Sequence, residues 1–154
     1  MSIEIERKFL TVDDRWRSLV KGVSIRQGYL SSHADRIVRV RIEGALALLT
    51  IKSRTVGVSR GEWEYPIPLD DAAKFLSELC EKPIIEKNRY RIPHQGMVWE
   101  VDEFLGDNAG LVVAEIELDA ADQQFAKPDW IGAEVTHDTR YFNANLLRHP
   151  YTRW

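Results

Sequence analysis

In the stretch RIVRVRIE, residues Arg36–Glu43, charged and apolar side chains alternate. Arg39 and Arg41 share one parity, and the opposite parity carries Val38, Val40 and Ile42. Gly44 follows, and Ala45–Ser53, which reads ALALLTIKS, is suited to be the partner strand of a hairpin. Because successive side chains of a strand face opposite sides of the sheet, this segment predicts an antiparallel pair with one charged face.

Similar period-two segments fill most of the chain and are separated by Gly, Pro, Asp and Ser. We expect further strands at Ile3–Leu10, Val23–Leu30, Val58–Leu69, Ile84–Ile92, Met97–Leu105 and Leu111–Leu118. Helical spacing predicts a short segment over Asp13–Val20 and a helix capped by Asp70 that runs to Cys80. A helical turn after Ala120, a loop around Pro128 and a helix over Tyr141–Leu147 complete the chain. This order predicts a single sheet-dominated α+β domain over residues 1–154.

The charged face of the expected sheet carries mostly one sign of charge per strand. Residues two apart in a strand lie about 7 Å apart on the same face. The sets are Glu4, Glu6 and Lys8; Arg39 and Arg41; Glu62 and Glu64; Lys87, Arg89 and Arg91; Glu100 and Asp102; and Glu115 and Glu117, with Lys52 alone among apolar neighbours. Like charges at this spacing repel one another, so their clustering calls for a physical reason.

Two interpretations fit these charged positions. They form the solvated face of an ordinary antiparallel sheet, with opposite charges paired across strands. Alternatively, the sheet closes into a barrel with the charges inside and the apolar parity outside, covered by the helices. Buried charges need partners, and a phosphate chain with divalent metal ions would pair with both signs. The single-sign strands favour the second interpretation.

Composition limits the other classes of function. The formal net charge of the 154 residues is −3, which argues against a nucleic-acid binder. The one cysteine, Cys80, has the spacing of a helix-core residue and cannot form an intrachain disulfide. No signal-like N-terminal segment or membrane-length apolar run is present, so we expect a cytoplasmic protein without a membrane partner. His33, His94, His137 and His149 are scattered and lack zinc-site spacing.

The ordered series of charged motifs resembles the CYTH superfamily, also called triphosphate tunnel metalloenzymes. The series begins with the E-x-E-x-K pattern at Glu4, Glu6 and Lys8 and ends at Glu115-x-Glu117. Between them lie Arg39-x-Arg41, Lys52, Glu62-x-Glu64, Glu86-Lys87-x-Arg89-Tyr90 and Asp102. The resemblance is strongest to the short bacterial proteins that hydrolyse inorganic triphosphate, and it spans Ile3 to about Ala144. It implies a closed eight-stranded antiparallel β-barrel that encloses a tunnel, with a few covering helices.

The resemblance also assigns roles to residues of this chain. It implies metal binding, by Mg²⁺ or Mn²⁺, at Glu4, Glu6, Glu62, Glu64, Asp102, Glu115 and Glu117. It implies phosphate binding at Lys8, Arg39, Arg41, Lys52, Lys87, Arg89 and Arg140, the last near the tunnel mouth. Lys8 and Tyr29 match a proposed catalytic dyad, for which Tyr29 would need a nearby cation to lower its pKa. From the residues alone, a structural tyrosine of the barrel is the favoured interpretation of Tyr29, and only the resemblance gives the catalytic role equal weight.

The resulting hypothesis is metal-dependent hydrolysis of inorganic triphosphate, a small-molecule substrate, to diphosphate and phosphate. The alternatives are an adenylate cyclase, a thiamine triphosphatase and a non-catalytic binder of polyphosphate or nucleotide. Trp63 and Trp99 lie on the parity opposite the charges, which favours packing under the helices over base stacking. An uncovered part of the apolar outer face would allow a homodimer.

Overall fold

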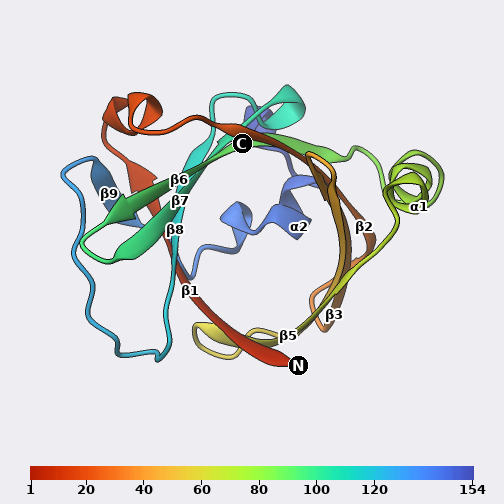
Figure 1. The fold of residues 1–154 in the computed structure, drawn as a ribbon, viewed down its shortest axis with the longest axis horizontal. Helices are drawn as coiled ribbons and strands as arrows, with labels where there is room; N and C mark the ends of the chain where they lie inside the picture. The colour runs from red at the N-terminus through yellow and green to blue at the C-terminus, as the bar shows by residue number, and fades with distance from the viewer.

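The computed structural model describes residues 1–154 and consists of one closed sheet with short helices around it (Figure 1). All strand pairs are antiparallel, and the hydrogen-bonded order is β5-β4-β3-β2-β6-β7-β8-β1-β9. An additional pairing of β5 with β1 closes β1–β8 into an eight-stranded barrel, and β9 pairs with the far end of β1. The predicted barrel is therefore confirmed.

The strands follow the sequence expectation closely. Their bounds are β1 Ser2–Thr11, β2 Val23–His33, β3 Arg36–Glu43, β4 Leu46–Ser53, β5 Ser59–Pro66, β6 Ile85–His94, β7 Met97–Phe104, β8 Val112–Glu117 and β9 Ile131–Glu134. The hairpin predicted from Arg36–Glu43 and Ala45–Ser53 is β3–β4, in which Glu43 pairs with Leu46. Gly44 adopts φ +61° in its tight turn, a conformation that is easy for glycine and strained for other residues.

The helices are shorter than the sequence predicted. They are η1 Arg15–Ser18, α1 Leu69–Lys74, η2 Phe75–Leu79, η3 Gly106–Asn108, η4 Thr139–Tyr141, α2 Asn143–Leu146 and η5 Tyr151–Arg153. The prediction that Asp70 caps its helix was wrong, because Pro68 is the N-cap and Asp70 lies in the first turn. There its charge still interacts favourably with the helix N-terminus. The helix also changes to π-helical turns in η2 instead of continuing as a regular α-helix to Cys80.

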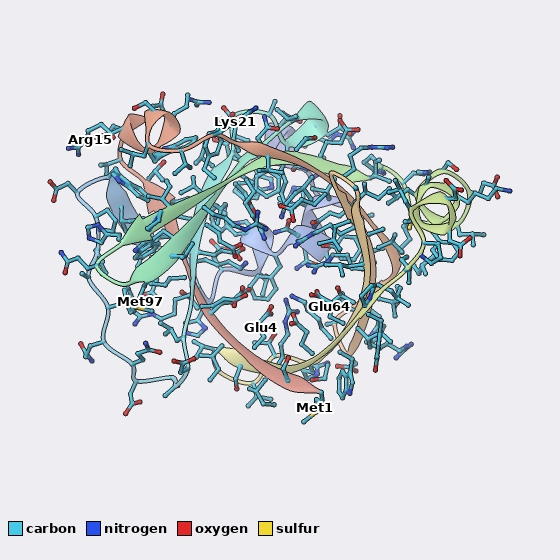
Figure 2. All side chains as sticks on the ribbon, in the orientation of Figure 1. Met1, Glu4, Arg15, Lys21, Glu64 and Met97 are labelled. Carbon is cyan, nitrogen blue, oxygen red and sulfur yellow. The ribbon has the colours of Figure 1, made fainter.

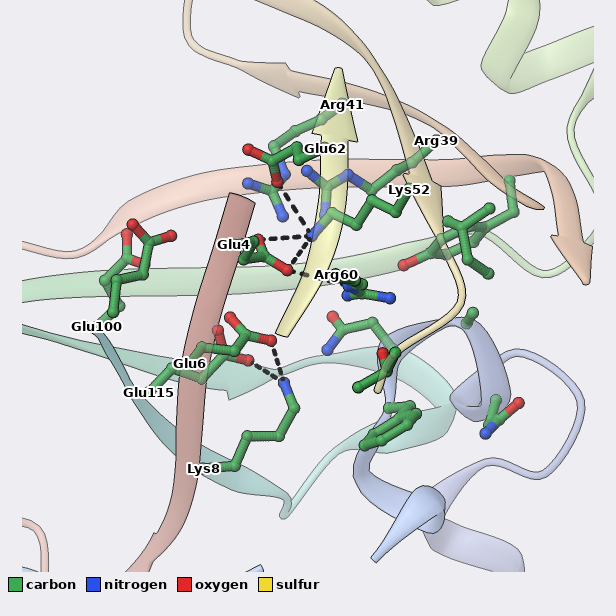
Figure 3. Close-up of a pocket in the computed structure, with 18 of the residues that line it drawn as sticks. Glu4, Glu6, Lys8, Arg39, Arg41, Lys52, Arg60, Glu62, Glu100 and Glu115 are labelled. Carbon is green, nitrogen blue, oxygen red and sulfur yellow. Dashed lines mark hydrogen bonds and ion pairs between the residues drawn. The ribbon is translucent and has the colours of Figure 1, made fainter. Parts of the chain in front are cut away.

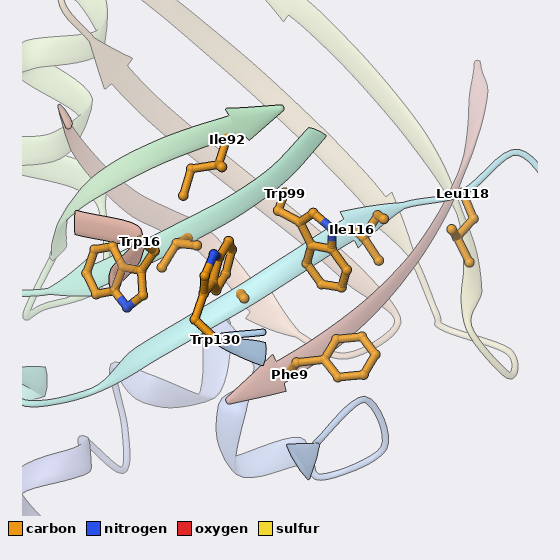
Figure 4. Packing of buried hydrophobic residues seen from close by; sticks show 9 residues of the cluster. Phe9, Trp16, Ile92, Trp99, Ile116, Leu118 and Trp130 are labelled. Atoms are coloured by element: carbon orange, nitrogen blue, oxygen red, sulfur yellow. The ribbon is translucent and has the colours of Figure 1, made fainter. Parts of the chain in front are cut away.

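Two of the three apolar clusters lie outside the barrel wall, where helices and loops cover them, and the other lies at one end of the interior. Beneath α1 and η2, Ala72, Leu76 and Cys80 pack on outward-facing Val40 and Ala47. A second cluster joins Tyr141, Leu146 and Leu147 of the C-terminal segment to one end of the barrel. The third cluster contains Phe9, Trp16, Ile92, Trp99, Val101, Ala114, Ile116, Leu118 and Trp130 (Figure 4). Away from the end where Tyr29 and Ile37 meet the C-terminal segment, charged side chains dominate the inward parity.

The two tryptophans of the outer face behave differently. Trp99 is fully buried and packs edge-to-face on Phe9, Phe125 and Trp130, with ring centroids 5.4–6.4 Å apart. Its cover comes from the loop that precedes β9, and Trp16 of η1 belongs to the same buried cluster. Trp63 is only half-buried. The loop predicted around Pro128 in fact leads into β9, a four-residue strand that the sequence analysis missed.

Candidate active site

The barrel encloses a cavity of about 630 Å³, which is lined by side chains from all the barrel strands, β1–β8, and from the C-terminal segment. Only eight of its 32 lining residues are hydrophobic, so the interior is a charged space. Glu4 and Glu64 point into the ring in the full side-chain view, whereas Arg15 lies outside it (Figure 2). This placement supports the closed-barrel interpretation of the charged positions over a solvated sheet face.

Three carboxylates form a cluster on one wall. Glu4 and Glu6 lie two residues apart on β1, and Glu6 is paired across the strands with Glu117 of β8. One carboxylate oxygen from each residue lies within 4.8 Å of the others. Burial raises the pKa of Glu117 to about 7, and the nearby carboxylates of Glu100, Glu4 and Glu6 add to the effect. Oxygen ligands carrying this excess of negative charge fit a hard divalent cation.

Glu115 lies beside this cluster, but its partner is a lysine. The Lys8 Nζ atom lies 2.5 Å from a Glu115 oxygen and 3.3 Å from a Glu6 oxygen (Figure 3). Burial alone would lower the pKa of Lys8, but the two carboxylates together raise it above its usual value. Lys8 is therefore a fixed ammonium ion next to the acidic cluster.

Glu4 also joins the acidic cluster to basic residues of the nearby strands β4 and β5. The Lys52 Nζ atom lies 2.9 and 3.0 Å from the two Glu4 oxygens, and Arg60 Nε donates to Glu4 at 3.0 Å (Figure 3). Lys52 also lies 3.4 Å from Glu62. Although burial disfavours the Glu4 carboxylate, Lys52 and Arg60 lower its pKa below the usual range. Glu4 is thus ionised and ready to accept a cation.

The basic wall is formed by β3 and β6. Arg39, Arg41, Lys87 and Arg89 all line the cavity. Arg39 approaches Glu64 at 3.9 Å, and the Thr50 hydroxyl donates to the same carboxylate at 2.9 Å. Burial lowers the pKa of Lys87 to about 7, with Arg89 and Arg41 nearby acting in the same direction. These donors match the geometry and charge of phosphoryl oxygens.

Asp102 lies behind the basic wall and is absent from the cavity lining. Arg89 donates to its two oxygens at 2.8 and 2.9 Å, and Lys87 Nζ lies 2.9 Å from one of them. Burial opposes ionisation of Asp102, but Arg89 and Lys87 outweigh it and hold its pKa well below the usual range. Its register partner on β6 is Arg89, so the structure places this predicted metal ligand among the cations.

Tyr29 and Arg140 also differ from the sequence expectation in their surroundings. Tyr29 lines the cavity, but its hydroxyl accepts a hydrogen bond from Gln27 Nε2 at 3.0 Å and has no bond to Lys8. Arg140 is exposed and paired with Asp138 at 2.7 Å, and its guanidinium lies over the Trp154 ring. Arg140 is outside the cavity lining, because the turn at Thr139–Tyr141 directs it to the surface.

The structure adds four residues that the sequence analysis did not include in the site. Arg60 lies two residues from Glu62, so the same period-two rule would have found it, whereas Glu100 was already placed on the charged face by that rule but was assigned no role. Gln27 lies two residues before Tyr29 on β2, and its side chain is fully buried. Asn143 reaches the cavity from α2 and accepts a hydrogen bond from Lys87 at 2.8 Å, a contact for which the sequence carries no signal.

Comparisons with known proteins agree with this geometry. An inorganic triphosphatase of Acetivibrio thermocellus is 53% identical over 151 residues, covering 98% of this chain and 97% of that protein. An inorganic triphosphatase of Nitrosomonas europaea is 40% identical, covering 93% and 95%. The crystal structure of the inorganic triphosphatase NE1496 has a TM-score of 0.66 at 34% identity, covering 93% and 96%. No helix in the structure is long and apolar enough to cross a membrane.

Structures of lower identity share the fold. A putative adenylate cyclase from Bacillus halodurans has a TM-score of 0.59 at 16% identity, with 79% of this chain and 84% of that chain covered. The family description "CYTH domain" matches residues 2–151, nearly the whole chain. Together with the barrel and its charged interior, this match establishes that the chain belongs to the CYTH domain family.

Proposed function

We propose that this protein is a divalent-metal-dependent hydrolase that converts inorganic triphosphate to diphosphate and phosphate inside the barrel. The observation that carries the proposal is the opposition of two charged walls in one cavity. An acidic cluster of Glu4, Glu6 and Glu117 lies across from the cations of β3 and β6. The 53% identity to an inorganic triphosphatase over 98% of the chain supports the substrate and the reaction.

The metal would be held by Glu4, Glu6 and Glu117, whose oxygens are close enough to share one ion. When bound there, Mg²⁺ or Mn²⁺ supplies positive charge to the phosphate oxygens and lowers the pKa of coordinated water. Glu115 and Glu62 are not part of this cluster. Glu115 pairs with Lys8 and Glu62 pairs with Lys52, so each carboxylate neutralises a lysine. Glu64 lies next to Arg39. We assign these three, and Asp102, to orienting the cations instead of binding metal.

The chain's own side chains stabilise the reacting phosphate. Arg39, Arg41, Lys52, Lys87 and Arg89 hold its oxygens and balance the charge that accumulates as water adds and the bridging P–O bond breaks. Lys8 supplies fixed positive charge on the acidic side. Tyr29 is our candidate for proton transfer, because its hydroxyl is buried in the cavity and receives the Gln27 N–H.

The proposal is tested by phosphate release from inorganic triphosphate, ATP and thiamine triphosphate, with Mg²⁺, with Mn²⁺ and with EDTA. We expect turnover of inorganic triphosphate above the other two, dependent on metal, and lost by at least 100-fold in Glu4→Gln. The exposed Glu78→Gln variant is the matched control and should behave as wild type. Cyclic AMP from ATP, preferred turnover of thiamine triphosphate, or tight binding without turnover would each contradict the proposal.

A test of the Tyr29 assignment is the Tyr29→Phe variant, which removes only the hydroxyl. We expect kcat to fall by at least tenfold with little change in KM, because proton transfer is affected and phosphate binding is not. Unchanged turnover would remove Tyr29 from the reaction and leave it as a structural residue of the barrel.

A further inference from the structure

Gln27 is a fully buried amide at the centre of the basic wall. It lies on β2, where it pairs with Arg41 of β3 on one side and Ile85 of β6 on the other. Its side chain joins three elements: β3 through Arg41, its own strand through Tyr29, and the C-terminal segment through Asn143. A buried polar side chain with this many contacts fixes the positions of its neighbours.

The chemistry of the partners determines which way the Gln27 amide faces. Arg41 Nε and Nη2 both donate to Gln27 Oε1, at 3.0 and 2.8 Å. A guanidinium can only donate, so the oxygen must face Arg41 and the nitrogen must face away. Gln27 Nε2 then donates to Tyr29 Oη at 3.0 Å and to Asn143 Oδ1 at 3.1 Å. Because the Tyr29 oxygen accepts this bond, its own proton is free to point into the cavity.

Arg41 differs from the other cations of the cavity in having a neutral partner. Carboxylates lie within 4.0 Å of the charged nitrogens of Lys8, Arg39, Lys52, Arg60, Lys87, Arg89 and Arg91. The hydrogen bonds of Arg41 go to Gln27 alone. Burial lowers the pKa of Arg41 to about 9, and the neighbouring Arg39 and Arg89 contribute to the effect. The positive charge of Arg41 is therefore buried without being neutralised.

We propose that Gln27 is a positioning residue that holds Arg41 and the Tyr29 hydroxyl toward the triphosphate while leaving the charge of Arg41 available for a phosphate group. This inference rests on the proposed function and adds a specificity device to it. A carboxylate at position 27 would hold the guanidinium equally well but would neutralise it. The amide gives the same geometry without the ion pair, so the incoming phosphate becomes the counter-ion of Arg41.

The decisive variant is Gln27→Glu, which keeps the shape of the side chain, adds the charge beside Arg41 and replaces the Nε2 donor to Tyr29 and Asn143 with an acceptor. We expect binding of inorganic triphosphate, measured by calorimetry in EDTA so that metal-dependent turnover cannot consume it, to weaken by about 10–100-fold. The melting temperature should stay the same or rise, because the new carboxylate pairs with Arg41. Opposite changes in stability and binding would not arise from a merely structural role. The exposed Gln124→Glu variant adds the same charge at the surface and should bind as wild type.

A double-mutant cycle tests whether Gln27 acts through Arg41. We expect Gln27→Met and Arg41→Met each to weaken triphosphate binding, and the double variant to bind no more weakly than Arg41→Met alone. If the losses in binding free energy of the two single variants add in the double variant, the proposal is overturned. A triphosphate affinity of Gln27→Glu within twofold of wild type would overturn it as well. A wild-type protein that binds triphosphate neither in EDTA nor with Mg²⁺ would overturn both this inference and the proposed function. A wild type that binds triphosphate but does not hydrolyse it with Mg²⁺ or Mn²⁺ would overturn the proposed function alone.

Discussion

Replacing Asp102 with asparagine tests whether this residue supports the basic wall instead of binding metal. Asp102 is 1% exposed and holds both Lys87 and Arg89, so the Asp102→Asn variant leaves buried Lys87 without its counter-charge and leaves Arg89 with Glu100 alone. Breaking a buried ion pair from one side costs about 3–5 kcal/mol. For a chain of 154 residues, an unfolding entropy of about 2.1 cal/mol/K per residue converts this cost to a melting temperature lower by about 9–15 °C.

The assay is thermal unfolding followed by circular dichroism in EDTA, at several pH values. Folding lowers the pKa of Asp102, so its contribution is complete above the unfolded pKa of about 3.9 and is lost as the pH falls below it. The gap between wild type and variant should therefore be full at pH 7 and should narrow in acid. Inorganic triphosphate should raise the melting temperature of the variant more than that of wild type, because it replaces the missing negative charge.

The control is Asp122→Asn, which changes the same atoms at an exposed position. A melting temperature of Asp102→Asn within 3 °C of wild type at pH 7 would refute the reasoning. The reasoning would also be refuted if Asp102→Asn, stripped of metal with EDTA and titrated with Mg²⁺, lost as much metal affinity as Glu117→Gln. Asp102 would then act as a metal ligand. The second result would also return Asp102 to the metal-binding role that the family resemblance implied.

Three further predictions follow from the site geometry. Mg²⁺ affinity measured by calorimetry should rise as the pH passes 7, because Glu117, whose pKa is raised to about 7, must lose its proton; Glu117→Gln should abolish that dependence. Triphosphate binding at pH 8 should be accompanied by uptake of a proton, because a bound phosphate raises the pKa of Lys87 from about 7. Calorimetric titrations in two buffers of different ionisation enthalpy measure this proton uptake, and Lys87→Met should abolish it. Arg140→Ala should keep kcat/KM within twofold of wild type, because Arg140 is exposed and bound to Asp138; a tenfold loss would place it in the substrate path.

Alternation along the strands predicted the antiparallel sheet and its charged face, and the family resemblance added the closed eight-stranded barrel and the roles of the site residues. The parity of Arg39 and Arg41, or of Glu4 and Glu6, assigns each pair to one face, and the apolar partners on the other parity require cover outside. The position of the hairpin at Gly44 followed from turn chemistry. These features are local in the chain, which is why the sequence is enough to specify them.

Strand register and contacts between distant segments could not be predicted from the sequence. Asp102 shares a parity with Glu100, yet its direct partner across the strands is Arg89, and that pairing withdraws it from the acidic wall. The Asn143 contact depends on how the C-terminal segment folds back against the barrel. Arg140 is directed to the surface by the local bond between its backbone N–H and Asp138. Each of these outcomes depends on pairing between segments far apart or on a turn whose side-chain direction the pattern does not encode.

The central claim is that the two charged walls together hydrolyse inorganic triphosphate with the help of a divalent cation. Its most direct test is ³¹P nuclear magnetic resonance of inorganic triphosphate incubated with the purified protein, first in EDTA and then after Mg²⁺ is added. The account predicts an unchanged spectrum in EDTA, followed by equal amounts of diphosphate and phosphate once Mg²⁺ is present. Triphosphate that stays intact in Mg²⁺ and in Mn²⁺, or that is cleaved equally well in EDTA, would contradict it.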